Sequence, residues 1–428
     1  MTDRLYYYDS SRCQFEGEVV DVIPATEINR RHGVILDRTA FYPTSGGQVH
    51  DTGFLMTTSG DESHKIRVAQ VAELEDGRVV HYIEADRAPQ KGTKIYGEID
   101  PERRRDHMQQ HSGQHVLSAA FVRLFNMPTL SFHMGNESCS IDLETATLSV
   151  QQVEQAEALA NQVVQENRPV AIRFVSQEDA STQGLRKAPT VATDELRLVD
   201  IQDFDLTPCG GTHVRGTGQI GAILLRKIEK VRQGWRVEFV CGQRAVVTAH
   251  RDYSTLTAAA GLLSTNIWEL PQQVRKSLDE IKAARKTGER LLEEVAELQA
   301  ARLLSETPVA SGRKVIVRVS KDRDLGFVKL LAQKLTRCES SVIALLASTL
   351  GQPSLVFAQS PGQPFDMGML LRTTVASLGG RGGGNKDLAQ GGVPQGAGLE
   401  EALSQLASAL PRLVTRPQSG PPSSSLTG

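Results

Sequence analysis

The sequence has few features of a secreted or membrane-spanning protein. It contains no run of 18 or more apolar residues, so we expect no membrane span. The segment Met1–Ser11 is polar and rich in tyrosine, lacks the apolar core of a secretory signal, and therefore favours the cytoplasm. Only five cysteines occur in 428 residues, an odd and widely spread set that argues against a disulfide scaffold: Cys13, Cys139, Cys209, Cys241 and Cys338.

A strong charge of either sign is also missing. The net charge is −2, so the composition as a whole does not indicate a nucleic-acid partner. Two local basic runs stand out: Arg103–Arg105, and the segment from Arg226 to Arg251 with seven Lys or Arg and two Glu. Each run is interpreted either as solvated surface or as a set of phosphate contacts.

The chain length predicts a multidomain α+β protein with two to four domains. Residues 1–98 read as a small β-barrel or curled sheet, because short runs rich in Val and Ile alternate with turn formers. The predicted strands there are Glu18–Ile23, Gly33–Leu36, Ile66–Val71 and Val79–Ile83.

Residues 99–250 mix helices and strands. The spacing predicts helices over Pro101–Phe125 and Val150–Asn167. The predicted strands are Val170–Val175, Leu196–Ile201, Ile220–Lys227 and Trp235–Cys241.

Residues 251–308 are predicted to be a helical linker, with its clearest helix at 270–306 after Pro271. A heptad seam runs along this helix through Leu278, Ile281, Leu292 and Val295. Arg285 and Gly288 interrupt it, so a packed arm is favoured over a long coiled coil. Residues 309–416 suggest a C-terminal α/β domain, and 417–428, rich in Pro, Ser and Gly, a disordered tail.

Two short motifs combine good zinc ligands. His111 and His115 are four residues apart on a predicted helix, so both imidazoles lie on one side of it. Cys209 and His213 flank a Gly-Gly-Thr turn, 94 residues beyond His115. Each pair alone is a weak signal, but together they make a four-ligand set of three His and one Cys. A closed set of this kind is usually structural, whereas a catalytic site needs an open or exchangeable position, and the sequence leaves both possibilities open.

Two further segments are rich in small residues. The loop Phe41–Gly53 contains Ser45-Gly46-Gly47-Gln48 and either lets a ligand approach the backbone or forms a hairpin turn. The segment Gly379–Lys386 has five glycines with Arg381 and Lys386, so it is read either as a phosphate cradle or as a flexible linker. It is not a P-loop, because Asp387 follows Lys386.

In this order, the four motifs resemble the editing half of alanyl-tRNA synthetase and the free-standing, long-form alanyl-tRNA editing proteins. The resemblance covers about residues 1–410 and implies that His111, His115, Cys209 and His213 bind zinc. It implies hydrolysis of serine or glycine from mischarged alanine tRNA. Residues 309–416 resemble the synthetase's C-terminal domain, which implies tRNA binding or a homodimer through 270–416. The aminoacylation domain is not found before residue 1, so neither ATP nor alanine ligation is expected.

Selectivity for serine over alanine needs a polar partner for the serine hydroxyl. The candidates are Thr44 and Gln48 in the N-terminal loop, and Thr129 and Ser131 just after the zinc helix. Thr44-Ser45 departs from the commonest family loop, which puts the substrate preference in question. Three rival hypotheses remain: a non-catalytic tRNA-binding protein with structural zinc, a zinc hydrolase for another ester or amide, and a synthetase fragment that acts within a complex.

Overall fold

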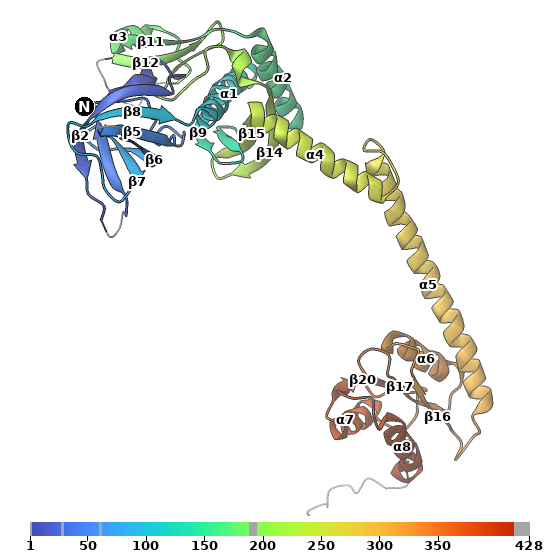
Figure 1. Cartoon of the computed structure of the whole chain (residues 1–428). Helices are drawn as coiled ribbons and strands as arrows, with labels where there is room; N and C mark the ends of the chain where they lie inside the picture. The colour runs from blue at the N-terminus through green and yellow to red at the C-terminus, as the bar shows by residue number, and fades with distance from the viewer. Residues whose placement is uncertain (1, 27–29, 60–61, 188–194, 415–428) are drawn as a thin grey trace, which may run out of the picture. The chain divides into compact units, whose positions relative to one another are not determined.

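The computed structural model describes residues 2–26, 30–59, 62–187 and 195–414. By its internal contacts the chain divides into two units, Met1–Ala259 and Ala260–Gly428. Figure 1 labels the elements of each unit. The tail at 417–428, predicted to be disordered, lies outside the described residues.

The first part of unit 1 is a closed six-stranded antiparallel barrel, which confirms the predicted small barrel. Its interior is filled by alternate apolar side chains such as Val34, Leu55 and Ile83. Beside it lie a short parallel pair, β1 (Asp3–Arg4) with β4 (Arg38–Thr39), and the 3-10 turn Leu5–Tyr7. In spatial order the barrel strands are β2 (Gln14–Ile23), β3 (His32–Leu36), β7 (Val79–Glu84), β6 (Glu62–Glu73), β5 (Gly53–Ser59) and β8 (Lys94–Ile99).

The helix α1 (Pro101–Phe125) follows the barrel directly and runs through the core of the rest of unit 1. Its start is fixed by Pro101 in the first turn and by Asp100, whose carboxylate accepts from the N–H groups of Glu102 and Arg103. It ends at Asn126, which adopts a left-handed conformation with φ of 53°. The predicted bounds of this helix are confirmed.

Two small sheets pack around α1. The predicted strand Ile220–Lys227 is wrong at its start, because Thr217–Ile220 forms a 3-10 turn and the strand begins at Ile223. One sheet has the order β14 (Ile223–Val231), β15 (Gly234–Cys241), β10 (Cys139–Leu143), β9 (Thr129–Met134); the other has β11 (Val170–Ser176), β12 (Glu195–Ile201), β13 (Asp205–Pro208). The helices are α2 (Val150–Glu166), α3 (Gln177–Thr182) and α4 (Gly242–Leu262).

Unit 2 begins with the long helix α5 (Leu270–Glu306). Ala296, Ala300 and Leu304 of α5 are buried in one apolar core with α6. A five-stranded mixed sheet follows, with helices and a second core on its other face. Its strand order is β16 (Lys314–Ser320), β17 (Val342–Ser348), β18 (Ser354–Gln359), β20 (Leu388–Gly392), β19 (Arg381–Gly384), and its helices are α6 (Leu325–Cys338), α7 (Met367–Ser377) and α8 (Leu399–Val414).

The glycine-rich segment after Gly379 is not a free linker. Its residues form the antiparallel hairpin β19–β20 at the edge of the unit 2 sheet. The pairing places Gly382 opposite Gly391 and Gly384 opposite Ala389. The interpretation as a flexible linker is therefore wrong, because the glycines let two strands approach closely.

Candidate metal centre and its pocket

The structure brings the two sequence motifs together at one point. His111 and His115 come from neighbouring turns of α1, and the loop Cys209–His213 follows β13. The nitrogen and sulfur atoms of His111, His115, Cys209 and His213 all lie within 4.8 Å of one another. Cys209 Sγ is 3.5 Å from His111 Nε2 and 3.3 Å from His213 Nε2. In tetrahedral zinc sites an S···N ligand pair is about 3.5 Å apart, given the usual bond lengths. The donor set therefore fits zinc.

Each of the three imidazoles has a polar partner at Nδ1, the ring nitrogen that points away from the cluster. His111 Nδ1 donates to Gln48 Oε1 at 2.8 Å, and His115 Nδ1 lies 3.3 Å from Asp205 Oδ2. The third, His213 Nδ1, is 3.1 Å from the Ser112 hydroxyl. A proton fixed on Nδ1 leaves the Nε2 lone pair free for a metal, and such outer partners usually orient metal-binding histidines.

The charges beside the cluster suit a cation. Asp205 receives two hydrogen bonds from Arg186, at 2.6 and 3.1 Å, and one from the Thr207 hydroxyl. Burial raises the pKa of Asp205, but the His115 contact and Arg186 outweigh it and lower the pKa to about 2. For Cys209, burial is likewise outweighed by the neighbouring histidines, and the thiol pKa falls well below its ordinary value. The cluster thus offers a thiolate ligand beside the three imidazoles.

Gly211 allows the loop to pass against the cluster. A Cβ atom built on Gly211 would lie 2.2 Å from His111 Cε1, which no side chain tolerates. A Cβ on the neighbouring Gly210 would contact the Tyr7 side chain at ordinary van der Waals distances, 3.4 Å or more. The two glycines of the motif therefore differ: only the second is required by a close approach.

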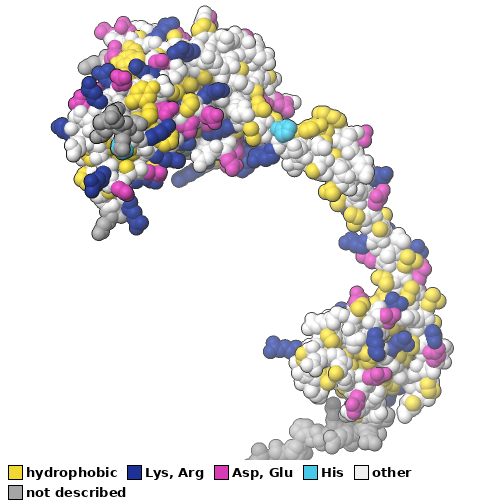
Figure 2. All heavy atoms as spheres, viewed as in Figure 1, with side chains coloured by type: hydrophobic (Ala, Val, Ile, Leu, Met, Phe, Trp, Pro, Cys, Tyr) yellow, Lys and Arg dark blue, Asp and Glu magenta, His cyan; other side chains and the backbone are white. Residues whose placement is uncertain are grey.

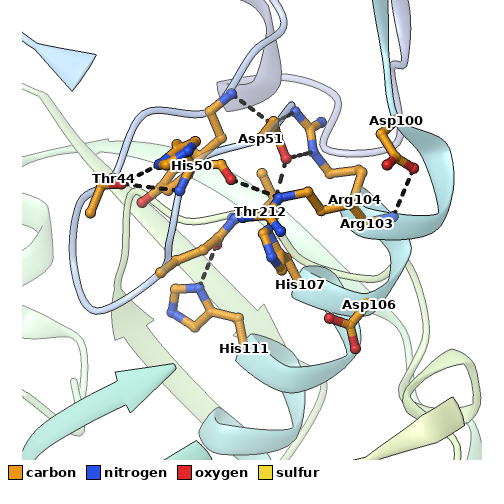
Figure 3. Close-up of polar contacts among 12 residues, drawn as sticks. Thr44, His50, Asp51, Asp100, Arg103, Arg104, Asp106, His107, His111 and Thr212 are labelled. Atoms are coloured by element: carbon orange, nitrogen blue, oxygen red, sulfur yellow. Dashed lines mark hydrogen bonds and ion pairs between the residues drawn. The ribbon is translucent and has the colours of Figure 1, made fainter. Parts of the chain in front are cut away.

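The N-terminal loop is anchored to α1 by a buried ion pair, shown in Figure 3. Arg104 and Asp51 are both fully buried, and Arg104 also donates to the carbonyls of Ser10 and Ala40. Asp51 in turn accepts the Tyr42 N–H at 2.7 Å. Arg104 was predicted to lie in a solvated or phosphate-binding run. That prediction is wrong for Arg104, because its guanidinium group is buried and paired with the Asp51 carboxylate.

A pocket of about 380 Å³ opens on the cluster, and its walls include His111, His115 and Cys209. Of the four predicted polar partners, Thr129 and Ser131 line it, whereas Thr44 and Gln48 do not. The Gln48 side chain is fully buried and bonded to His111 and Thr212.

Thr44 instead bonds His50 through its hydroxyl, as Figure 3 shows. Gln114, which the sequence analysis missed, lines the pocket. Its place three residues after His111, on the same helix face, is the signal that would have found it.

Comparisons with known proteins agree on one family. Models match for class II (A) tRNA synthetases at residues 2–103, the threonyl and alanyl tRNA synthetase second additional domain at 196–237, and the DHHA1 domain at 312–411. The alanyl-tRNA editing protein AlaX-L of Pyrococcus horikoshii is 31% identical over 92% of this chain and 95% of its own length. This chain belongs to the AlaX-L alanyl-tRNA editing family.

The same region also occurs within larger relatives. The alanine–tRNA ligase of Archaeoglobus fulgidus is 32% identical over 94% of this chain, but the match spans only 43% of the ligase. The chain thus covers less than half of that ligase. A solved C-Ala domain from Aquifex aeolicus alanyl-tRNA synthetase matches 24% of this chain and 97% of that domain, with 23% identity and a TM-score of 0.23.

In the described part of this AlaX-L relative, no helix is both long enough and apolar enough to cross a membrane.

Proposed function

We propose that this protein is a trans-editing hydrolase that releases serine or glycine from mischarged alanine tRNA by cleaving the aminoacyl ester. The observation that carries the proposal is the 380 Å³ pocket in which a zinc-type ligand set meets two hydroxyl side chains, Thr129 and Ser131. Membership of the editing family supports the same reaction. Ester hydrolysis requires no ATP, and we place the reaction in the cytoplasm.

His111, His115, Cys209 and His213 would hold the zinc in this proposal. When bound, zinc supplies either a Lewis acid for an attacking water or an anchor for the substrate's α-amino group. The chain's own residues prepare the site: Gln48, Asp205 and Ser112 fix the three imidazoles through Nδ1, so their Nε2 atoms converge before any ligand arrives. Arg186 keeps Asp205 charged and in place.

Selectivity is proposed to depend on Thr129 and Ser131. The Thr129 hydroxyl donates to Ser118 at 2.7 Å, so its oxygen still has a lone pair for a serine hydroxyl. The Ser131 hydroxyl is similarly committed to Asp142 at 2.7 Å. Alanine would leave such an oxygen unpaired in the pocket, which disfavours its hydrolysis. Thr129→Val should therefore reduce the preference for serine, with Thr44→Val as a control outside the pocket wall.

The decisive experiment measures deacylation of seryl- and alanyl-charged alanine tRNA by the intact protein and by a Cys209→Ala, His213→Ala variant. We expect rapid serine release, slow alanine release, and loss of both activity and bound zinc in the variant. If the intact protein binds charged tRNA but leaves both esters intact, a tRNA-binding role with structural zinc replaces the enzyme hypothesis. Hydrolysis of simple esters or amides without tRNA preference would favour the second rival, and activity only in a larger complex would favour the third.

We further propose that the chain forms a homodimer through 270–416. The helix α5 exposes an apolar stripe, visible as yellow side chains along it in Figure 2. In an antiparallel pair of these helices, Arg285 would face Gly288 of the second copy, and Leu278 would face Val295. A parallel pair would instead set Arg285 against Arg285, so we favour the antiparallel arrangement.

Leu278→Glu should convert a dimer to a monomer in light scattering, whereas Ser305→Glu, outside the stripe, should not. A monomeric intact protein would refute the proposal.

The domain division at residues 98, 250, 308 and 416 also remains a proposal.

A further inference from the structure

A second and larger cavity of unit 1 lies away from the candidate metal centre. It has a volume of about 1190 Å³, above the range of roughly 300–1,000 Å³ that is usual for small-molecule sites. Its walls come from the N-terminal part of α1, the β9–β10 turn and the first turns of α4. The lining of this cavity shares no residue with that of the ester pocket, although His107 on its wall lies one helical turn before His111.

The cavity joins the two basic runs that the sequence shows far apart. Arg103 and Arg105 come from the first run, while Arg244 and Arg251 come from the end of the second. These arginines are separated by more than 130 residues in the chain and share one wall only because α4 starts beside α1. The fold therefore selects, from two ordinary basic segments, the side chains that act together.

The four arginines are not equivalent. Arg244 is a structural clamp, because it holds Asp106 with two hydrogen bonds of 2.6 and 2.8 Å and donates to the Gly135 carbonyl. Arg103 donates its Nε–H to the His50 carbonyl. Arg105 and Arg251 are exposed, and within the described ranges neither guanidinium has a hydrogen-bond or ion-pair partner. These two side chains are free to bind an external anion.

The rest of the lining is mixed: acids, neutral hydrogen-bond donors and the apolar side chains of Val246 and Val247. Asp106 is paired with Arg244, and Glu102 and Glu137 also reach the wall, so the four arginines exceed the three acids by one charge. The neutral donors Gln109, Asn136 and Gln243 are of the kind that contact phosphate and sugar oxygens. Guanidinium groups bind phosphate in bidentate fashion.

We propose that this cavity binds the phosphate backbone of the substrate RNA, chiefly through Arg105 and Arg251, at a distance from the ester that is hydrolysed. The proposal deepens the function proposed above by naming a second contact for the tRNA. Since this contact serves affinity and not chemistry, its loss weakens binding of tRNA but leaves the ester pocket unchanged.

The test compares Arg105→Glu, Arg251→Glu double-substituted protein with an Arg232→Glu control. Arg232 is an exposed member of the second basic run that does not line the cavity. Affinity for uncharged alanine tRNA is measured by fluorescence anisotropy at several salt concentrations. We expect the double variant to bind roughly tenfold more weakly or worse, with the slope of log K against log salt reduced by about 1.5. The control should stay within about twofold of the unmodified protein.

Two results would overturn the inference: an unchanged affinity in the double variant, or an equal loss in the control. Failure of the unmodified protein to bind tRNA would do the same. A milder Arg105→Gln, Arg251→Gln variant, with circular dichroism of each protein, separates loss of contact from misfolding.

A second arm keeps this inference distinct from the proposed reaction. Hydrolysis of 3′-O-seryl adenosine, which carries no phosphate for the arginines to bind, should be the same in the unmodified protein and both variants. If no protein hydrolyses either substrate, the proposed function fails, and the binding arm still decides the present inference. If the double variant loses hydrolysis of the short ester as well, the cavity is not a separate contact and the inference is wrong.

Discussion

Two glycine-rich segments of this protein look alike in sequence and differ in the structure. The loop Cys209–His213 passes so close to α1 that a Cβ on Gly211 would collide with the His111 ring, and the Thr212 N–H in the loop donates to Gln48 Oε1. The segment Gly379–Gly392 contains a hairpin at a sheet edge, where Gly382 and Gly384 lie against the paired strand. In both segments glycine marks a position where a side chain would not fit. The neighbouring group, a histidine ring in one case and a strand in the other, decides whether that position belongs to a metal site or only to the fold.

The largest effect is expected from Gly211→Ala, in the loop that contacts the metal cluster. The added methyl group would collide with His111, so we expect loss of tightly bound zinc and a drop in deacylation of about 100-fold or more. Zinc content by mass spectrometry and the rate of serine release are the measurements. Gly210→Ala is the matched control, and it should keep its zinc. Equal zinc loss in both variants would show that the loop needs flexibility and not space.

The polar support of the metal loop gives a second, smaller effect. Gln48→Ala removes the acceptor for His111 Nδ1 and the partners of Thr212, so we expect zinc affinity to fall by about 10–100-fold. Competition with a chromogenic chelator measures it. Thr44→Ala alters the same loop without touching the cluster, and unchanged affinity in that variant completes the comparison. If Gln48→Ala retains full affinity, orientation through Nδ1 is not what assembles this site.

The hairpin of unit 2 should respond in stability alone. A Cβ on Gly384 would lie 2.3 Å from the Leu388 carbonyl oxygen, so Gly384→Ala should destabilise unit 2 by about 1–3 kcal/mol. Gly383, where an added Cβ meets nothing within 4 Å, provides the control. Thermal unfolding and zinc content are measured together. Loss of zinc in Gly384→Ala would contradict the view that this segment is separate from the metal centre.

Local patterns predicted what local physics controls. The bounds of α1 followed from Pro101 and the apolar spacing, and the barrel followed from short Val- and Ile-rich runs between turns. The start of β14 was misplaced because the 3-10 turn at Thr217–Ile220 is apolar at its end and resembles a strand. The hairpin β19–β20 was missed because glycine has low strand propensity, and only the neighbouring strand β18 provides the pairing that stabilises it.

The sequence by itself determined the chemistry that is available: two His four residues apart on a helix, a Cys and a His around a tight turn, and hydroxyl groups just beyond the helix. The tertiary structure alone decided which polar residues serve which purpose. It buried Arg104 against Asp51, assigned Gln48 to His111 and not to the pocket, and joined Arg105 with Arg251. The reason is physical: helix periodicity is a property of neighbouring residues, whereas desolvation and hydrogen-bond pairing depend on segments that meet only when the chain folds.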